Sequence, residues 1–238
     1  MNTFLQKIII PLFILILFGS CQSSQEPSTK EVQNDTNILS SNQLETGDIL
    51  FVGLPMSYSL APDAQNEPAN PETCAGDSLN LIHVAIIEVE KDATWVIDAT
   101  LKRQVARYPL DTFLSDFTLA DGSYPLFIVK KLKDNSNAQY YINNAKKYIG
   151  KPYDVDFLPD NEAYFCSELV RNSYMTAEGE YLFREYPMNF QKTDGTFPVY
   201  WQQLFQYIHK EIPQGKIGTT PAQMSQEWCL QTIDCPIY

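Results

Sequence analysis

The sequence predicts one domain of the α+β class that begins near Leu44. Residues 81–89 and 95–100 are apolar runs of strand length, and the short polar stretch between them indicates a β-hairpin. Residues 137–149 and 200–210 instead repeat apolar side chains at helical spacing. The 238 residues are 44% hydrophobic, and no internal repeat or linker follows the start of the domain, so one packed core is the simplest arrangement.

Residues 1–20 have the pattern of a signal peptide. Lys7 precedes an apolar run over residues 8–18, which is too short to span a membrane comfortably but suits a signal-peptide core. Small residues directly before Cys21 resemble a bacterial lipoprotein signal, and that resemblance implies lipidation of Cys21. An ordinary secretory signal is the alternative, and either one directs the chain out of the cytoplasm.

Residues 21–43 are predicted to be a disordered tether between the lipid and the domain over residues 44–238. The tether is rich in Ser, Gln, Asn and Thr, so it cannot bury enough apolar surface to fold. We therefore expect a membrane-anchored lipoprotein of the bacterial cell envelope that faces the periplasm. The formal net charge of −12 disfavours nucleic acid and anionic membrane as partners, so the lipid anchor is the only membrane contact expected.

The chain has five cysteines, and an export compartment permits a disulfide among them. If Cys21 carries lipid and Cys166 is catalytic, Cys74, Cys229 and Cys235 remain, and the sequence leaves their pairing open. With two histidines and no Cys-x-x-Cys motif, the chain has no recognisable zinc spacing, so no metal or other cofactor is expected.

The other elements follow from the same patterns. Residues 53–80 form a long loop with several prolines, which is either a lid or binding edge or a tolerated surface insertion, with equal weight on each. Pro109 favours the start of a short helix, and Gly150 ends the helix over residues 137–149. In chain order, we expect strands at 49–52, 81–89, 95–100, 103–107 and 125–132, and helices at 109–117, at 137–149, from residue 163, and at 200–210.

The register of the hairpin decides whether His83 and Asp98 can meet. If two residues form the turn, Thr100 lies opposite His83, and Asp98 lies diagonally on the same face. Four loop residues keep Asp98 on that face, whereas three turn it to the opposite face. The sequence leaves these alternatives open.

A helix beginning near Ala163 would hold Cys166 in its first turn. The polar residues just before it are typical of a helix start, and apolar residues recur after Cys166 at helical spacing. The positive end of the helix dipole favours a thiolate there, and the thiolate is the nucleophilic form of cysteine. A buried structural cysteine is the alternative.

Only two histidines can serve as the base for this cysteine. His209 lies near the end of an amphipathic helix beside charged residues, where a solvated histidine is ordinary. His83 lies in the middle of an apolar strand, where burial would hold it rigidly, so it is the preferred base.

Five short segments then carry a family resemblance. They occur in the order Gly47–Leu50, His83–Ile86, Val96–Ala99, Gly150–Asp154 and Tyr164–Val170. Together they resemble the YiiX-like group of circularly permuted papain-fold enzymes, which are related to NlpC-type cell-wall peptidases. The resemblance runs from about Leu44 to residues 213–221. It implies a permuted papain-like fold, in which an antiparallel sheet packs against the helix that carries the nucleophilic cysteine.

The resemblance also implies roles for individual residues. Cys166 corresponds to the nucleophile, His83 to the base and Asp98 to the third polar group. The backbone N–H of Cys166 would be one oxyanion donor, and Tyr153 would be a second donor, line the substrate cleft, or serve packing alone. The loop before the histidine strand is longer here than is typical of the family, so access of the substrate is an open question.

These residues predict a thiol hydrolase that cleaves an amide bond through a thioester intermediate. A peptidoglycan peptide is the first substrate expected, and a lipid amide or ester, with hydrolysis or acyl transfer, is the alternative. A non-catalytic binding module of the cell envelope is a third possibility. Several aromatic side chains near the C-terminus either line a lipid cleft or form core: Phe183, Phe190, Phe197, Trp201 and Phe205.

Overall fold

A computed structural model describes residues 44–68, 79–91, 93–159 and 161–231. The expectations for the signal peptide, the lipidated Cys21 and the tether lie outside these residues, as do Cys74 and Cys235. In the described part of the chain, no helix has both the length and the apolar character needed to cross a membrane.

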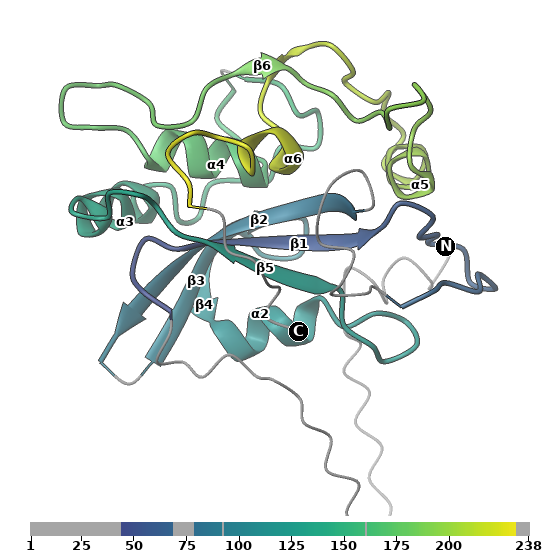
Figure 1. Cartoon of the computed structure of the whole chain (residues 1–238), viewed down its shortest axis with the longest axis horizontal. Helices are drawn as coiled ribbons and strands as arrows, with labels where there is room; N and C mark the ends of the chain where they lie inside the picture. The colour runs from purple at the N-terminus through teal and green to yellow at the C-terminus, as the bar shows by residue number, and fades with distance from the viewer. Residues whose placement is uncertain (1–43, 69–78, 92, 160, 232–238) are drawn as a thin grey trace, which may run out of the picture.

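Five antiparallel strands form the centre of the molecule (Figure 1). Their order across the sheet is β4-β3-β2-β1-β5, so the first four are neighbours in sequence and the fifth pairs with β1. The strands are β1 (Ile49–Pro55), β2 (Leu79–Glu90), β3 (Ala93–Thr100), β4 (Gln104–Pro109) and β5 (Leu126–Lys130).

Helices cover both faces of this sheet, as Figure 1 shows. Helix α2 (Leu110–Asp116) lies beneath it, α3 (Ala138–Lys146), α4 (Cys166–Ser173) and α6 (Pro221–Met224) lie above it, and α5 (Val199–Tyr207) lies at the end of the upper layer. The α+β class predicted from the sequence is therefore confirmed. The remaining elements are β6 (Tyr186–Pro187) and β7 (Ile217–Gly218), which pair as a short ribbon.

The alternation of side chains along each strand produces a separate core on each face of the sheet. The upper core joins Phe51 and Ile86 to Leu169 and Val170 of α4. The lower core joins the intervening strand residues to Phe113 of α2. Burial on both faces explains why the strands are almost continuously apolar. The apolar side chains of α4, among them Leu169 and Val170, hold this helix on the sheet.

The β2–β3 hairpin has the two-residue connection. Glu90 pairs with Ala93 and Ile86 pairs with Ile97, which is the register that places Asp98 on the same face as His83. Lys91 has a φ of 50°, the left-handed conformation that tight hairpin turns favour. Of the alternatives left open by the sequence, the structure therefore has one that allows the two side chains to meet.

The helix that carries Cys166 begins later than the sequence predicts. It starts at Cys166 itself rather than near Ala163, because Phe165 is extended, with φ −92° and ψ 167°. Tyr164 forms a parallel bridge with Tyr153, and this pairing keeps the chain extended up to the cysteine. Asn161, taken as part of a helix start, instead closes a turn by accepting a hydrogen bond from the N–H of Ala163 at 2.8 Å. Cys166 thus occupies the first helical position.

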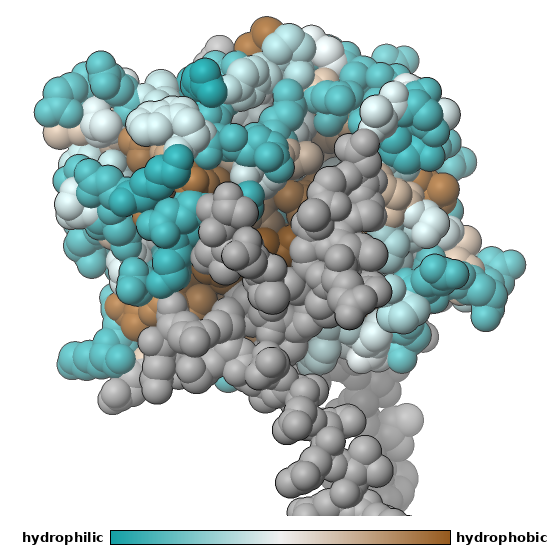
Figure 2. All heavy atoms as spheres, viewed as in Figure 1, coloured by the Kyte–Doolittle hydropathy of each residue, from teal (hydrophilic) through white to brown (hydrophobic). Residues whose placement is uncertain are grey.

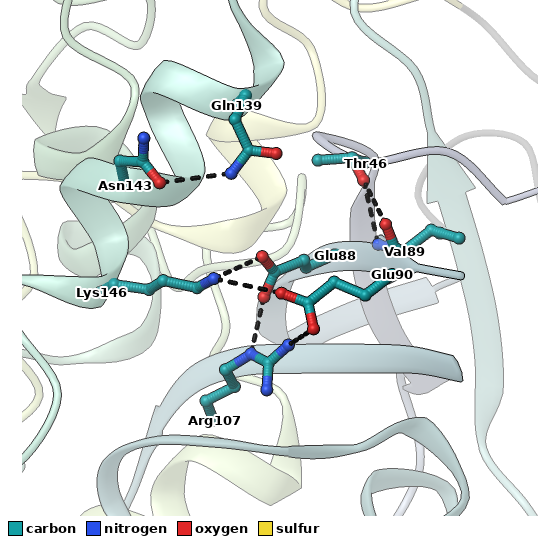
Figure 3. Close-up of polar contacts among 8 residues, drawn as sticks. All are labelled: Thr46, Glu88, Val89, Glu90, Arg107, Gln139, Asn143 and Lys146. Carbon is teal, nitrogen blue, oxygen red and sulfur yellow. Dashed lines mark hydrogen bonds and ion pairs between the residues drawn. The ribbon is translucent and has the colours of Figure 1, made fainter. Parts of the chain in front are cut away.

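A cluster of four charged side chains connects α3 to strands β2 and β4 (Figure 3). Glu88 accepts hydrogen bonds from Arg107 Nε and from Lys146 Nζ, both at 2.6 Å. Glu90 pairs with the same two cations at 2.9 and 3.5 Å. The Glu88 side chain is only 2% exposed, whereas that of Glu90 is 50% exposed, so Glu88 is the member that depends on its partners.

We expect Glu88→Gln to destabilise the fold by about 1.5–3 kcal/mol, because a buried hydrogen-bonded charge is lost. Urea unfolding followed by circular dichroism measures this change. Glu90→Gln is the matched control, and it should have little effect because solvent screens that carboxylate. Equal effects of the two variants would show that the cluster does not depend on its buried member.

Asp48 is a second buried carboxyl group, at the start of β1. Its Oδ2 accepts a hydrogen bond from the N–H of Glu45 at 2.9 Å and lies 3.8 Å from Lys131 Nζ. Burial outweighs these contacts and raises the pKa of Asp48 to about 6. The folded state therefore holds this proton more tightly than the unfolded state does, and the resulting stability is lost as the pH rises from about 4 through 6.

We expect Asp48→Asn to remove this part of the pH dependence, because asparagine keeps an acceptor for Glu45 and does not ionise. The measurement compares the urea midpoints of the two proteins between pH 4 and 7. The wild type should lose stability relative to the variant across that interval. A constant difference would show that Asp48 does not titrate as described.

Candidate active site

His83 is held in place by a buried carboxylate. Its Nε2 lies 3.0 Å from Oδ2 of Asp98, and the two residues are 7% and 0% exposed. Because a carboxylate only accepts, Nε2 carries the proton in this pair. The second ring nitrogen, Nδ1, is then the one available to another group.

Two aromatic rings from α2 and the residue that follows it pack against this imidazole. The ring centroids of Phe113 and Phe117 lie 6.0 and 5.0 Å from that of His83. They contact the ring without competing for its polar atoms. The imidazole therefore has a fixed position and a defined tautomer, which a proton-transfer group requires.

Cys166 reaches the same place from the other layer of the fold. As the first residue of α4, it sits where the backbone N–H groups of a helix have no partners within the helix. Its side chain is 4% exposed and belongs to the upper core, and the cysteine is a free thiol. The positive end of the helix dipole favours a thiolate at this position.

Cys166 and His83 line the same cavity, and the sulfur is among the groups that shift the pKa of the imidazole. Burial alone would lower the pKa of His83, because it disfavours the charged ring. The charge of Cys166, hydrogen bonds with Asp98 and Cys166, and the charge of Asp98 together outweigh burial and raise that pKa to about 10. The charged form of the imidazole is therefore favoured, with Asp98 as the acceptor of its Nε2 proton.

A cavity of about 120 Å³ opens onto Cys166 and His83. This volume admits an extended group rather than a single water molecule. The walls are mainly apolar and aromatic, and Tyr58 and Leu54 contribute one of them from β1 and the loop that follows it. On the face shown in Figure 2, hydrophilic side chains dominate the described surface, and apolar ones show in smaller patches between them.

Residues 56–66 of the long loop are fastened to α5. Gln203 Oε1 accepts a hydrogen bond from the N–H of Leu60 at 2.5 Å, and its Nε2 donates to Ser59 Oγ at 2.9 Å. Tyr58, between the strand and these contacts, is 4% exposed. This part of the loop therefore lines the cavity through Tyr58, while residues 69–78 lie outside the described chain.

Tyr153 lines the cavity beside Cys166. Burial, followed by the charge of Cys166, raises its pKa well above the ordinary value for tyrosine. Tyr200 of α5, for which the sequence predicts no role, lines the same cavity, and burial and Cys166 raise its pKa as well. Both phenols therefore share this cavity with the sulfur of Cys166.

Of the C-terminal aromatic residues, some line the cavity and others form core. Phe190 and Trp201 line the cavity. Phe183 belongs to the upper core, and Phe205 packs under Trp201 and Phe190 in a separate cluster. Only part of the aromatic set is thus available to a substrate.

The remaining titratable candidates lie apart from this site. His209 is exposed beyond the end of α5. Cys229 is a buried free thiol whose Sγ donates to the carbonyl oxygen of Leu182 at 3.7 Å. Within the described ranges, no group of three or more His, Cys, Asp or Glu side chains could hold a metal ion.

Besides Tyr200, the structure adds a second polar residue that the sequence patterns do not indicate, Tyr108. The hydroxyl of Tyr108, on β4, donates to Asp98 Oδ2 at 2.9 Å. Asp98 pairs with Ala106 across β3 and β4, so Tyr108 lies on the same face as Asp98. Finding it from the sequence would have required the pairing of these two strands.

The comparisons with known proteins agree with the fold class. Residues 43–234 match the model of the family described as permuted papain-like amidase enzymes, YaeF/YiiX, C92 family. The uncharacterized protein YiiX of Escherichia coli strain K12 is 23% identical over 194 residues, which cover 80% of this chain and 86% of that protein. The crystal structure of the metalloprotein yiiX from Escherichia coli O157:H7 has a TM-score of 0.54 at 22% identity, and the match covers 80% of this chain and 97% of that one.

The interaction of His83 with Cys166 can be tested without a substrate. We expect His83→Ala to slow alkylation of Cys166 by iodoacetamide at pH 6 at least about tenfold, because an unassisted thiol, with a pKa of about 8.5, is almost fully protonated there. Mass spectrometry of the Cys166 peptide measures the rate. His209→Ala is the control and should alkylate like the wild type. Equal rates in all three proteins would show that the imidazole does not act on the sulfur.

Proposed function

The chain belongs to the permuted papain-like amidases of the YaeF/YiiX type, the C92 family, and on this basis we propose that it is a thiol hydrolase that cleaves an amide bond through Cys166, His83 and Asp98. One observation carries the proposal. A single buried imidazole bonds to Asp98 through one nitrogen and interacts with Cys166, at the wall of a cavity large enough for a substrate group.

In the proposed reaction, His83 first takes the thiol proton of Cys166 on Nδ1, which forms a thiolate and an imidazolium. The sulfur attacks the amide carbonyl carbon, and the carbon–nitrogen bond then breaks as His83 gives its Nδ1 proton to the leaving nitrogen. This leaves a thioester on Cys166. Water attacks the thioester while His83 takes up a proton, and the carbon–sulfur bond breaks to release the acid and restore the thiolate.

Developing negative charge on the carbonyl oxygen needs donors near the sulfur. The backbone N–H of Cys166, at the start of α4, is one proposed donor. The hydroxyl of Tyr153 is proposed as the second, because this residue lines the cavity and interacts with the charge of Cys166. Asp98 keeps the imidazole oriented throughout and does not exchange protons in this scheme.

A cell-wall peptide is the first substrate class we propose, on the basis of the lipoprotein-like signal before Cys21 and the resemblance to cell-wall peptidases. The lipoprotein would then act at the bacterial cell envelope, anchored through Cys21. The apolar lining of the cavity, including Phe117, Phe190 and Trp201, favours a second candidate. That candidate is a lipid amide or ester whose acyl chain lies in the cavity, with hydrolysis or acyl transfer as the outcome.

The Escherichia coli protein of known structure is described as a metalloprotein. The described residues of this chain do not present a set of metal ligands, so they do not fit a metal ion. No step of the proposed reaction passes through one.

We expect Cys166→Ala to abolish turnover and to leave the melting temperature nearly unchanged, because only the nucleophilic sulfur is removed. The substrates are muropeptides and N-acyl amides, incubated in parallel with protein that starts near Ser41 and analysed by mass spectrometry. Cys229→Ala, which removes the second buried free thiol, is the matched control and should retain turnover. Turnover that survives in Cys166→Ala would refute the assignment.

The same screen separates the two substrate classes. Release of stem-peptide fragments supports the first, and release of a fatty acid supports the second. We expect Trp201→Ala to reduce turnover of an acyl substrate and to spare that of a muropeptide if the cavity holds the acyl chain. Absence of turnover with both libraries, together with an unreactive Cys166, would favour a binding module.

A further inference from the structure

The carboxylate of Asp98 has two donors on one oxygen. His83 Nε2 lies 3.0 Å from Oδ2, and the Tyr108 hydroxyl donates to the same Oδ2 at 2.9 Å. The other oxygen, Oδ1, is buried and has no hydrogen-bond partner among the described residues. With Asp98 fully buried, Tyr108 is thus the one donor besides the imidazole that the described residues give this carboxylate.

Tyr108 is itself held firmly. It is 6% exposed, it packs with Phe113 at a centroid distance of 6.4 Å, and the guanidinium of Arg103 lies 4.5 Å from the centre of its ring. Arg103 Nε in turn donates to Asp116 Oδ2 at 2.6 Å. The hydroxyl therefore has little freedom to leave Asp98.

We propose that Tyr108 is a positioning residue, which aims Asp98 Oδ2 at His83 and thereby holds the imidazole in the orientation that serves Cys166. The inference deepens the proposed function and rests on it. Tyr108 lines the cavity but contacts the catalytic groups through Asp98, so its role is to orient rather than to react. Arg103 supports the arrangement from above the ring, as a cation close to a buried carboxylate.

A carboxylate with one donor can rotate about its bond to Cβ, whereas two donors on the same oxygen fix its plane. Loss of the Tyr108 hydroxyl removes one charge-assisted hydrogen bond, and such bonds are among the stronger ones in proteins. The consequence appears at His83, whose charged form would no longer face a fixed acceptor. A purely structural role for Tyr108 would instead show only in stability.

The chain has two histidines, so the titration of His83 can be followed directly. Heteronuclear NMR of the imidazole groups should give two sets of signals, one from buried His83 and one from exposed His209. In Tyr108→Phe we expect the pKa of His83 to fall from its value of about 10, because Asp98 Oδ2 is no longer fixed opposite Nε2 of the ring. The signals of His209, which is exposed beyond α5, should be the same in both proteins and serve as the internal reference.

Tyr174→Phe is the matched control. Its hydroxyl donates to the carbonyl oxygen of Gly47 at 2.9 Å, and the residue is fully buried in the upper core, away from Asp98. Removing it deletes an equally buried phenolic hydroxyl, so it should affect stability without shifting the titration of His83. If Tyr108→Phe leaves the titration of His83 as in the wild type, or if both variants shift it equally, the inference is wrong.

Activity separates this inference from the proposed function. With whichever substrate the wild type turns over, Tyr108→Phe should reduce kcat by about 10- to 100-fold with little change in KM, since it weakens orientation and not binding. The NMR titration needs no substrate, so it remains decisive if no turnover is found. An unchanged kcat alongside a shifted titration would overturn the claim that the orientation serves Cys166.

Discussion

The contact between His83 and Asp98 is the constraint on which the rest of the site depends. Two buried side chains on neighbouring strands meet at 3.0 Å only because the hairpin between them has a two-residue connection. A connection one residue longer would turn Asp98 to the other face of the sheet and leave a buried imidazole without its acceptor. The register of one β-hairpin thus decides whether the imidazole has a defined tautomer.

The two layers of the fold bring the remaining groups to this imidazole. The sheet supplies His83 and Asp98, and α4, packed on the sheet through Leu169 and Val170, supplies Cys166 at its first residue. Because the chain stays extended until Phe165, the thiol lies at the first position of the helix, at its positive end. Burial gives this geometry its electrostatic strength, since charges interact more strongly where water is excluded.

Much of this arrangement could be predicted from the sequence, because it follows from local patterns. Apolar runs indicated the strands, helical spacing indicated the inward face of α4, and the small number of histidines pointed to His83. The predicted start of the cysteine helix was wrong by three residues. The bridge between Tyr164 and Tyr153 is a tertiary contact, and it overrides the preference of Asn161 for a helix start. Tyr108 and Tyr200 could not be found, because their places beside the site depend on strand order and on the packing of α5.

Trapping of an acyl-enzyme tests the central claim most directly. The protein is mixed with an activated acyl ester, quenched with acid within the first turnover and digested for mass spectrometry. The account predicts one acyl group as a thioester on Cys166 in the wild type and its loss when His83 is replaced. Acylation at another residue, or acylation of Cys166 at the same rate without the imidazole, would contradict it.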